Sequence, residues 1–273
     1  MAISVGLDIG GSTTKIVGMK DNEIIYKEII KADDPVTSAY GALGKLLNDN
    51  SLSVNDIECI NITGVGSSFP EGDLLGIKTV SITEFLATGL GGLYTSGLDR
   101  AVVVSMGTGT AFLEASYDRV RHIIGSGVGG GTIVGLCNAM VSIDDPEKLS
   151  DIAVDADIRR VDLTIGDISK AEIPGLPMDV TASNFGKAED DLSKPEKIAG
   201  IFNLVYQSIG TMAVLSSRNC SCRDVVFTGQ LTVLKQCRMY LSLFSGLYDI
   251  NMIIPANAEY ATAIGACLAG KDQ

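Results

Sequence analysis

Between Asp8 and Lys15 the chain combines the residue types that hold a phosphate and its metal ion. The segment is Asp8, Ile9, Gly10, Gly11, Ser12, Thr13, Thr14 and Lys15. The two glycines permit positive φ and a close approach of the backbone to a ligand, and their N–H groups with the neighbouring hydroxyl groups can form an anion-binding concavity. Lys15 adds a point charge suited to phosphate, and Asp8 can hold Mg²⁺ through water. The alternative is a tight hairpin that lies beside an acidic residue.

A second glycine turn repeats this chemistry. The string S-M-G-T-G-T at residues 105–110 lies between two strand-like segments, as the first glycine turn does. The repeat predicts two related lobes, each with one phosphate-binding hairpin, because a polyphosphate clamped between two lobes needs a cradle from each side. Taken alone, the second turn is equally well explained as an ordinary β-hairpin.

A longer glycine run, residues 125–132, precedes a helical pattern. Helix N-termini bind anions through unpaired N–H groups and the helix dipole, so this run is a third phosphate-binding candidate. It is not a Walker A loop, because no Gly-Lys-Ser/Thr follows. It is not a Rossmann turn either, because no acidic residue ends a second strand about twenty residues later. The alternative is a turn between the lobes.

Two further glycines lie near the C-terminus. Gly229, within Phe227–Gln230, ends a strand, where an adenine could lie against the backbone; an ordinary strand–helix turn is the alternative. Gly265 is flanked by alanine and isoleucine in the last helix. A glycine in the middle of a helix indicates close helix packing rather than contact with a ligand.

Hydrophobic periodicity places these turns in a series of strands and helices. Strands are expected at 3–7, 14–20, 23–30, 57–63, 78–82, 101–106, 120–124, 224–229 and 250–255, helices at 36–49, 84–96, 147–155, 196–218, 231–245 and 257–269, and surface loops at 162–194. We expect an N-terminal lobe of residues 1–100, onto which the C-terminal helix 257–273 packs back, and a C-terminal lobe of residues 101–256.

The composition argues against several classes of partner. Hydrophobic residues make up 46% of the 273 residues, so a sizeable core is feasible. A formal net charge of −12 argues against binding nucleic acid and against docking on an anionic membrane. No segment reaches the roughly 18 uninterrupted apolar residues of a membrane span, and no signal peptide is visible. The six scattered cysteines predict reduced, mostly buried thiols in a cytoplasmic protein.

In this order, D-x-G-G-S-T-T-K, S-M-G-T-G-T, F-T-G-Q and A-I-G-A resemble the motifs of the actin-like ATPase superfamily. Within it the chain is most similar to type II pantothenate kinases. This resemblance rests on I-T-E-F (82–85), on Arg121 ahead of G-S-G-V-G-G-G-T-I-V-G-L, and on D-V-T-A-S-N-F-G (179–186), and it spans nearly the whole chain. It implies an α/β, two-lobed actin-like ATPase (ribonuclease H-like) fold with duplicated mixed sheets flanked by helices.

The resemblance implies an enzyme that transfers the γ-phosphate of ATP to the primary hydroxyl of pantothenate, the first step of coenzyme A biosynthesis. It also implies Mg²⁺ as cofactor and a homodimer. Glu84 matches the family's catalytic base, and Arg121 matches the arginine that holds the substrate carboxylate. A hydroxyl nucleophile does need a nearby carboxylate to take its proton. Glu84 is also explained as a first-turn acidic residue favoured by the helix dipole, with Thr83 as N-cap, and the two roles can coexist.

The residues and the resemblance together give a set of expected contacts. The positions expected to bind ATP or its phosphates are Asp8, Gly10, Gly11, Ser12, Thr13, Thr14, Lys15, Thr108, Gly129, Gly130, Gly131, Thr132, Ile133, Gly229 and Gln230. Substrate-binding positions are Ser105, Thr108 and Arg121, and the metal position is Asp8. His122, the one histidine, follows Arg121 and is interpreted as a bystander.

Two departures from the family pattern leave the nucleotide preference open. The family's N-V-G-T-G-T-S-like string is S-M-G-T-G-T-A here, and Gln230-Leu231 stands where the family tends to carry serine after glycine.

Three alternatives on the same fold stay open. ATPase activators of 2-hydroxyacyl-CoA dehydratases carry a [4Fe–4S] cluster between two subunits and need cysteines at that interface. The D-V-T-A-S-N-F-G string counts against an N-acetylhexosamine kinase. Nucleotide-switched binding or filament proteins have longer chains with extra subdomains.

Overall fold

The structure is a computed structural model of the 273-residue chain, and it describes residues 3–11, 13–31, 34–68, 70 and 72–270. The N-terminal part is built on a five-stranded mixed sheet in the order β3-β2-β1-β4-β5. Its strands are β1 (Ile3–Ile9), β2 (Thr13–Lys20), β3 (Glu23–Lys31), β4 (Ile57–Thr63) and β5 (Thr79–Ser81). The strands β1, β2 and β3 form an antiparallel meander, whereas β1, β4 and β5 run parallel. The carboxyl ends of these three parallel strands therefore lie along one edge.

A second five-stranded sheet repeats this arrangement in the order β12-β11-β6-β7-β8. Its strands are β6 (Arg100–Met106), β7 (Thr110–Ser116), β8 (Arg119–Ser126), β11 (Asp224–Thr228) and β12 (Asn251–Ile253). Again three strands form an antiparallel meander, and two parallel strands follow beside the first of them. The prediction of an α/β fold with duplicated mixed sheets is confirmed.

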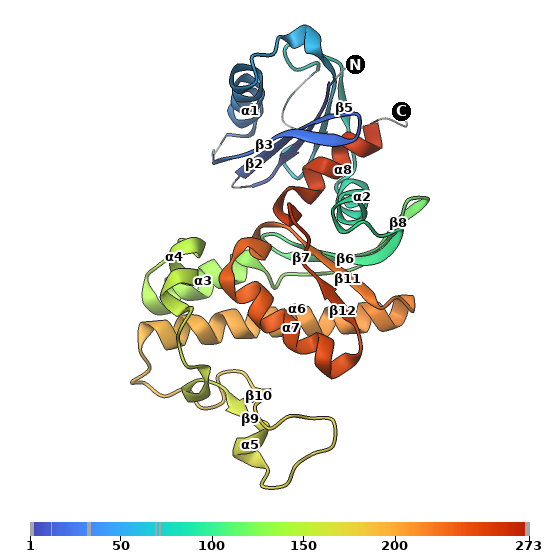
Figure 1. Cartoon of the computed structure of the whole chain (residues 1–273). Coiled ribbons are helices and arrows are strands. Elements are labelled where there is room, and N and C mark those ends of the chain that lie inside the picture. Colours follow the sequence, from blue (N-terminus) through green and yellow to red (C-terminus); the bar gives the residue numbers. More distant parts are fainter. Residues whose placement is uncertain (1–2, 12, 32–33, 69, 71, 271–273) are drawn as a thin grey trace.

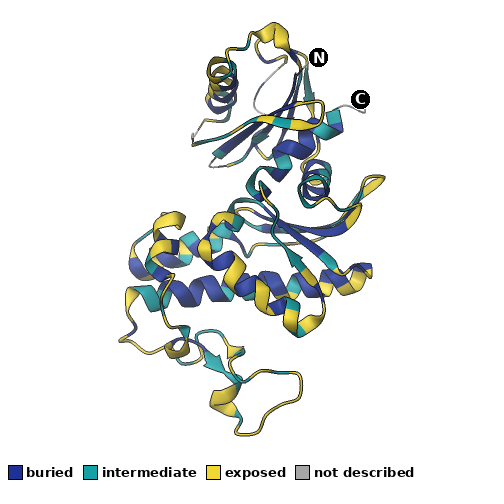
Figure 2. Ribbon diagram, viewed as in Figure 1, coloured by how far each residue is buried: buried dark blue, intermediate teal, exposed yellow. Residues whose placement is uncertain are grey.

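Helices flank both sheets, and two of them, α2 and α8, lie between the sheets (Figure 1). The helices are α1 (Pro35–Asp49), α2 (Glu84–Ser96), α3 (Gly130–Val141), α4 (Pro146–Ala153), α5 (Ile165–Ile168), α6 (Lys194–Cys220), α7 (Lys235–Tyr248) and α8 (Ala261–Ala269). A short ribbon of β9 (Leu163–Thr164) and β10 (Thr181–Ser183) projects beyond α6. Figure 2 shows that the sheet strands and α6 are largely buried, whereas this projecting part is largely exposed.

Local sequence signals explain where several helices begin. Asp34 caps α1, because its carboxylate accepts a hydrogen bond from the N–H of Thr37 at 2.6 Å, and proline occupies the first turn. At α6, Ser193 and Glu196 form a capping box: each side chain pairs with the backbone N–H of the other. These caps satisfy backbone donors that the helices leave without internal partners.

The helices α2 and α8 pack with their backbones almost in contact. A Cβ atom added at Gly265 would lie 1.7 Å from the carbonyl oxygen of Ala87, and one added at Gly91 would lie 1.7 Å from that of Ala261. The hydroxyl groups of Thr88 and Thr262 also meet across this seam at 3.1 Å. Gly265 therefore serves close helix packing, as the sequence predicts.

The same two helices join the sheets. Helix α8 packs on the first sheet, where a Cβ at Gly6 of β1 would lie 2.0 Å from the carbonyl oxygen of Ala263. Helix α2 packs on the second sheet, with Gly92 against Val103 of β6 and Gly89 against Val120 of β8. The α2–α8 seam is thus a direct mechanical link between the two halves.

Helix α6 packs against the second sheet and contributes to its hydrophobic core. Within the described part of the chain it is the helix that is long and apolar enough to cross a membrane, yet 67% of its most apolar window is buried inside the fold. Its buried residues, among them Phe202, Tyr206 and Ile209, share one cluster with Val102, Val104 and other residues of the second sheet. Its apolar length is therefore explained by its place in the core.

We expect Gly265→Ala to lower the free energy of unfolding by about 1–3 kcal/mol or more, because the new methyl group overlaps backbone atoms that cannot move without separating the two helices. Gly44→Ala is the matched control: Gly44 lies exposed in the middle of α1, with no atom within 4 Å of an added Cβ. That change should raise stability by about 0.5–1 kcal/mol. Urea denaturation of both variants checks this, and equal effects would contradict the seam's role.

Candidate active site

An ion pair lies at the carboxyl-terminal edge of the first sheet. Asp8 and Lys15 are directly opposite each other in the β1–β2 ladder, and Lys15 Nζ lies 3.4 Å from Asp8 Oδ2. Their side chains are only 13% and 10% exposed, so water screens this pair much less than it screens a surface pair. Gly6 and Val17, the neighbouring pair on the same face, pack against α8: a Cβ at Gly6 would lie 2.0 Å from the carbonyl oxygen of Ala263, and Val17 clusters with Ala263 and Ile264. The pair therefore lies on the face of the sheet that looks toward the second half.

The parallel strands bring two more residues to this edge. Thr63 is the last residue of β4 and pairs with Asp8 of β1. Its hydroxyl group is fully buried and, among the described residues, has no hydrogen-bond partner. Gly64, with φ of 90°, follows so closely that a Cβ there would lie 2.6 Å from Asp8 Oδ1. Sequence reasoning missed Thr63, although its place at the end of a parallel strand matches that of Asp8.

Glu84 begins α2 just after the third parallel strand, β5. Thr83 is the N-cap, as predicted, but its side chain makes no capping hydrogen bond. Glu84 as a whole is exposed, yet partial desolvation of its carboxyl group raises its pKa. The negative charge of Asp8 raises this pKa further, and the positive charge of Lys15 lowers it. These influences place Glu84 in the electrostatic field of the Asp8–Lys15 pair.

The first glycine turn is tighter than its sequence suggests. Gly10 donates its N–H to the carbonyl oxygen of Thr13 at 3.0 Å, and a Cβ at Gly10 would lie 2.9 Å from that oxygen. Neither Gly10 nor Gly11 uses the positive φ that glycine permits, so Gly10 is required by space rather than by handedness. Thr14 is buried and its hydroxyl group bonds that of Ser38 in α1, away from the Asp8–Lys15 face. Ser12 lies outside the described residues.

The second glycine turn is held by the long glycine run. Gly130 and Gly131 at the start of α3 donate their N–H groups to the carbonyl oxygens of Gly107 and Thr108, both at 2.9 Å. A Cβ at Gly129 would lie 2.7 Å from the Thr108 oxygen. Glycine is thus needed here so that α3 can approach the 107–109 turn.

The expectation that α3 offers unpaired N–H groups is therefore wrong. The N–H of Gly129 bonds the hydroxyl group of Thr132, and those of Thr132 and Ile133 bond the carbonyl oxygen of Gly129. The side chain of Ile133 is fully buried in the core beneath the second sheet. In this structure the run supports the hairpin, and Ser105 and Thr108, half-buried and exposed respectively, are the polar side chains that the hairpin itself supplies.

Gly229 makes a left-handed turn at the end of β11. Its φ is 92°, its N–H bonds the carbonyl oxygen of Ala258 at 2.9 Å, and a Cβ would lie 2.6 Å from the Met106 oxygen. Gln230 then begins a 3₁₀ turn, with a buried Oε1 that has no partner among the described residues. The glycine is required by the turn itself, and Gln230 has an acceptor available for a ligand.

Arg121 is not brought to Glu84. Its guanidinium group bonds Glu114 on the adjacent strand at 2.7 Å and lies 4.0 Å from Sγ of Cys220, the last residue of α6. Glu114 pairs with Val102, whose side chain belongs to the core that α6 covers. Arg121 therefore lies on the α6 side of the second sheet, whereas Glu84 belongs to α2 on the opposite side.

His122 lies on the side of the sheet that Arg121 does not reach. Its imidazole stacks on the ring of Phe85, with centroids 4.5 Å apart and an interplanar angle of 10°. Phe85 follows Glu84 in the first turn of α2. Strand alternation was the signal that could have separated Arg121 from His122, since successive side chains point to opposite faces.

The D-V-T-A-S-N-F-G string wraps a buried carboxylate. Asp162 is fully buried and accepts hydrogen bonds from Thr181 Oγ1, Asn184 Nδ2, the N–H of Phe185, and Asn203 Nδ2 of α6. Four donors replace the water that a buried carboxylate loses. The string therefore fastens the projecting ribbon of β9 and β10 to α6.

The donor set at the sheet edge fits a hydrated Mg²⁺ rather than a metal caged by protein. In the part of the chain that the structure describes, no three His, Cys, Asp or Glu side chains gather around one point. Magnesium commonly takes one or two carboxylates and completes its shell with water and phosphate oxygens. Asp8 provides one such carboxylate, with Glu84 nearby.

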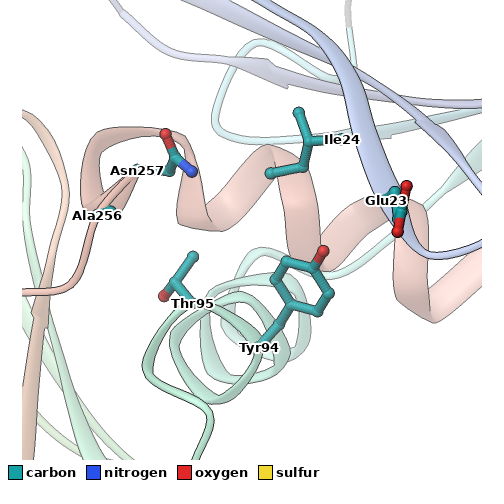
Figure 3. A pocket seen from close by; sticks show the side chains of 6 residues that line it. All are labelled: Glu23, Ile24, Tyr94, Thr95, Ala256 and Asn257. Atoms are coloured by element: carbon teal, nitrogen blue, oxygen red, sulfur yellow. The ribbon is translucent and has the colours of Figure 1, made fainter.

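A shallow recess on the molecule is distinct from this edge. It is lined by Glu23, Ile24, Tyr94, Thr95, Ala256 and Asn257, with Tyr94 and Ile24 facing each other across it (Figure 3). The Tyr94 hydroxyl group donates to the carbonyl oxygen of Asn22, in the turn that joins β2 to β3. That turn lies at the opposite end of β2 from Lys15, so the recess is separate from the Asp8–Lys15 pair.

Comparison with known proteins matches this sequence to a family. The family described as Fumble matches residues 100–268. The chain is 30% identical to a type II pantothenate kinase of Staphylococcus aureus strain USA300, over 87% of this chain and 93% of that protein. It is 29% identical to the type II pantothenate kinase of strain MRSA252, over 98% of this chain and 100% of that protein.

Solved structures with a similar fold include kinases and an activator. The activator of 2-hydroxyisocaproyl-CoA dehydratase from Clostridium difficile, with bound ADPNP, has a TM-score of 0.71 at 18% identity, covering 99% of this chain and 94% of that one. A ROK family glucokinase from Streptomyces griseus, in complex with glucose and AMPPNP, has a TM-score of 0.61 at 10% identity, covering both chains fully. At such identities the likeness shows the fold, and it confirms the predicted fold class.

We expect Glu84→Gln to raise the melting temperature at pH 7. Since folding raises the pKa of Glu84 above its ordinary value of 4.5, the ionised carboxylate opposes folding at pH values above the raised pKa. Well below pH 4.5 the carboxyl group is protonated in both states and this opposition disappears. The difference in melting temperature between variant and parent should therefore shrink as the pH falls from 7 to 4.

The control for this measurement is Glu147→Gln, which removes a first-turn carboxylate from α4. It changes the net charge equally and loses the favourable interaction with a helix dipole, so it should leave the melting temperature unchanged or lower it. Differential scanning fluorimetry across this pH range gives both values. A lower melting temperature for Glu84→Gln than for Glu147→Gln at pH 7 would contradict the desolvation of Glu84.

Proposed function

Because this chain belongs to the Fumble family and has type II pantothenate kinases as full-length relatives, we propose that it transfers the γ-phosphate of ATP to the primary hydroxyl of pantothenate. The product is 4′-phosphopantothenate, the first intermediate on the way to coenzyme A. The observation that carries this proposal is that Glu84 lies within the electrostatic influence of the Asp8–Lys15 ion pair at the edge of the parallel strands.

Glu84 serves as the general base in this proposal. Its raised pKa makes it a stronger proton acceptor than an ordinary glutamate. Its position at the start of α2, exposed on one side, lets an acceptor hydroxyl group approach. Proton removal from the hydroxyl and positioning of the phosphate are the two tasks that phosphoryl transfer asks of the protein.

Lys15 and the two glycine hairpins hold the phosphates in this proposal. Lys15 is paired with Asp8 in the structure. Asp8 would hold a hydrated Mg²⁺ through water, and Lys15 would then be available to phosphate oxygens. Thr108 and Ser105 supply hydroxyl groups from the opposite hairpin, and Gly229 with Gln230 faces the adenine side. Mg²⁺ supplies neutralisation of the phosphate charge.

The alternative on the same fold is the ATPase activator. The likeness to the dehydratase activator shows the fold at 18% identity, and such proteins need cysteines at an interface for their cluster. Five of the six cysteines here, all but Cys59, are buried, which favours the kinase. We further propose that the protein is a cytoplasmic homodimer, as the resemblance implies. We propose that residues 1–100 form the N-terminal lobe, with the C-terminal helix 257–273 packing back onto it, and that residues 101–256 form the C-terminal lobe.

The test of the reaction is ADP release with Mg-ATP, measured with pantothenate, with N-acetylglucosamine and with no acceptor. We expect release that depends on pantothenate. Glu84→Gln should lower kcat by about 10²- to 10⁴-fold, the usual contribution of a general base, while the Kd for ADPNP stays within about threefold. Retained turnover in Glu84→Gln would remove Glu84 as the base, and release without any acceptor would favour an ATPase.

We expect Lys15→Ala to raise the Kd for ATP by about tenfold or more, because a charge-assisted hydrogen bond to phosphate is lost. Lys20→Ala is the matched control, since Lys20 ends the same strand β2 and is exposed. Isothermal titration with ADPNP gives both affinities, and melting curves show that each variant is folded. Equal affinities in the two variants would exclude Lys15 from the phosphate site.

A further inference from the structure

The stacked pair of Phe85 and His122 borders the proposed catalytic base. Phe85 is the next residue after Glu84, and it is 44% exposed. His122, on β8, is exposed too, and its Nε2 lies 3.7 Å from where a Cβ of Gly125 would be. The imidazole therefore leans along β8 toward the end of the strand that leads into the 125–132 run. Helix α2 and strand β8 together form an open wall beside Glu84.

The strand pattern puts His122, and not its neighbour Arg121, on this wall. Val120 contacts Gly89 of α2, and His122 pairs with Leu113, which belongs to the cluster of residues that α2 covers. Arg121, between them, points to the α6 side and is engaged by Glu114. A side chain cannot serve both faces of a strand, because successive residues alternate.

Electrostatics decide where the acceptor's own charge can lie. Pantothenate has its primary hydroxyl group at one end and a carboxylate at the other. The hydroxyl must approach Glu84, which lies in the field of Asp8, so both protein carboxylates repel the acceptor's carboxylate at this end. The acceptor's carboxylate must therefore extend away from Asp8 and Glu84, and His122, stacked on Phe85, is a neighbouring N–H donor.

Resting on the proposed function, we infer that His122, held flat against Phe85, donates a hydrogen bond to the carboxylate of the acceptor and so selects a carboxylate-bearing hydroxy compound. Stacking fixes the plane of the imidazole, so the direction of its N–H is set before the acceptor binds. His122 is a binding residue in this assignment rather than the bystander that its sequence context suggests. Arg121 pairs with Glu114 on the opposite face of the sheet.

The test compares two acceptors of nearly equal size, pantothenate and pantothenol, in which CH₂OH replaces the carboxylate. His122→Phe keeps an aromatic ring for the stack and removes the N–H. It should raise the KM for pantothenate about tenfold or more, leave kcat within about threefold, and leave the KM for pantothenol unchanged. His122→Arg, which supplies a donor again, should bring the KM for pantothenate back toward the parent value.

Three results would overturn the assignment. The KM for pantothenate could stay unchanged in His122→Phe; both acceptors could weaken equally, which would reduce His122 to a structural role; or Arg121→Gln could reproduce the selective loss. Melting curves establish that each variant is folded. Failure of the proposed function is distinct, since the parent enzyme would then show no pantothenate-dependent ADP release before any variant is measured.

Discussion

The near contact between the backbones of α2 and α8 is the constraint on which the rest of the molecule depends. Only a hydrogen atom on Gly91 and on Gly265 leaves room for the carbonyl oxygens of the opposite helix. Because α8 packs on the sheet that carries Asp8 and α2 begins with Glu84, this seam determines how far Glu84 lies from the Asp8–Lys15 pair. It also carries α2 onto the second sheet, which brings Phe85 to His122. A wider seam would move Glu84, the Phe85–His122 stack and the two glycine hairpins apart together.

Glycines in this chain serve two different physical needs. At Gly64 and Gly229 the backbone has positive φ, which other residues adopt only at a cost. At Gly129, Gly130 and Gly131 the need is space: α3 approaches the 107–109 turn so closely that carbonyl oxygens of the turn accept the first N–H groups of the helix. The first N–H groups of this helix are hydrogen-bonded within the protein. The glycine run thus gives the hairpin its shape.

Some of this architecture follows from local sequence, and some does not. Asp8 and Lys15 were predictable as a pair, because a short glycine turn between two strands places residues opposite each other in an antiparallel ladder. The strands, the long helix α6 and the helix packing at Gly265 follow from periodicity and from glycine placement. The role of Thr63 depends on which parallel strands become neighbours, a long-range property that no local pattern contains. The same holds for Asp162, whose four donors come from residues up to 41 positions away.

Arg121 and His122 show why matching a motif does not by itself assign a role to a residue. The two residues are adjacent in sequence, but the period of a strand is two residues, so a one-residue shift moves a side chain to the other face of the sheet. Arg121 carries the stronger and more permanent charge, and on residue type alone it is the better partner for a carboxylate. However, Arg121 lies on the face of the sheet that carries Glu114 and adjoins the end of α6. Its guanidinium group is already paired there with the carboxylate of Glu114. The face of the sheet on which a side chain lies therefore outweighs its intrinsic strength as a carboxylate partner, and the packing of Val120 and Leu113 against α2 determines that face.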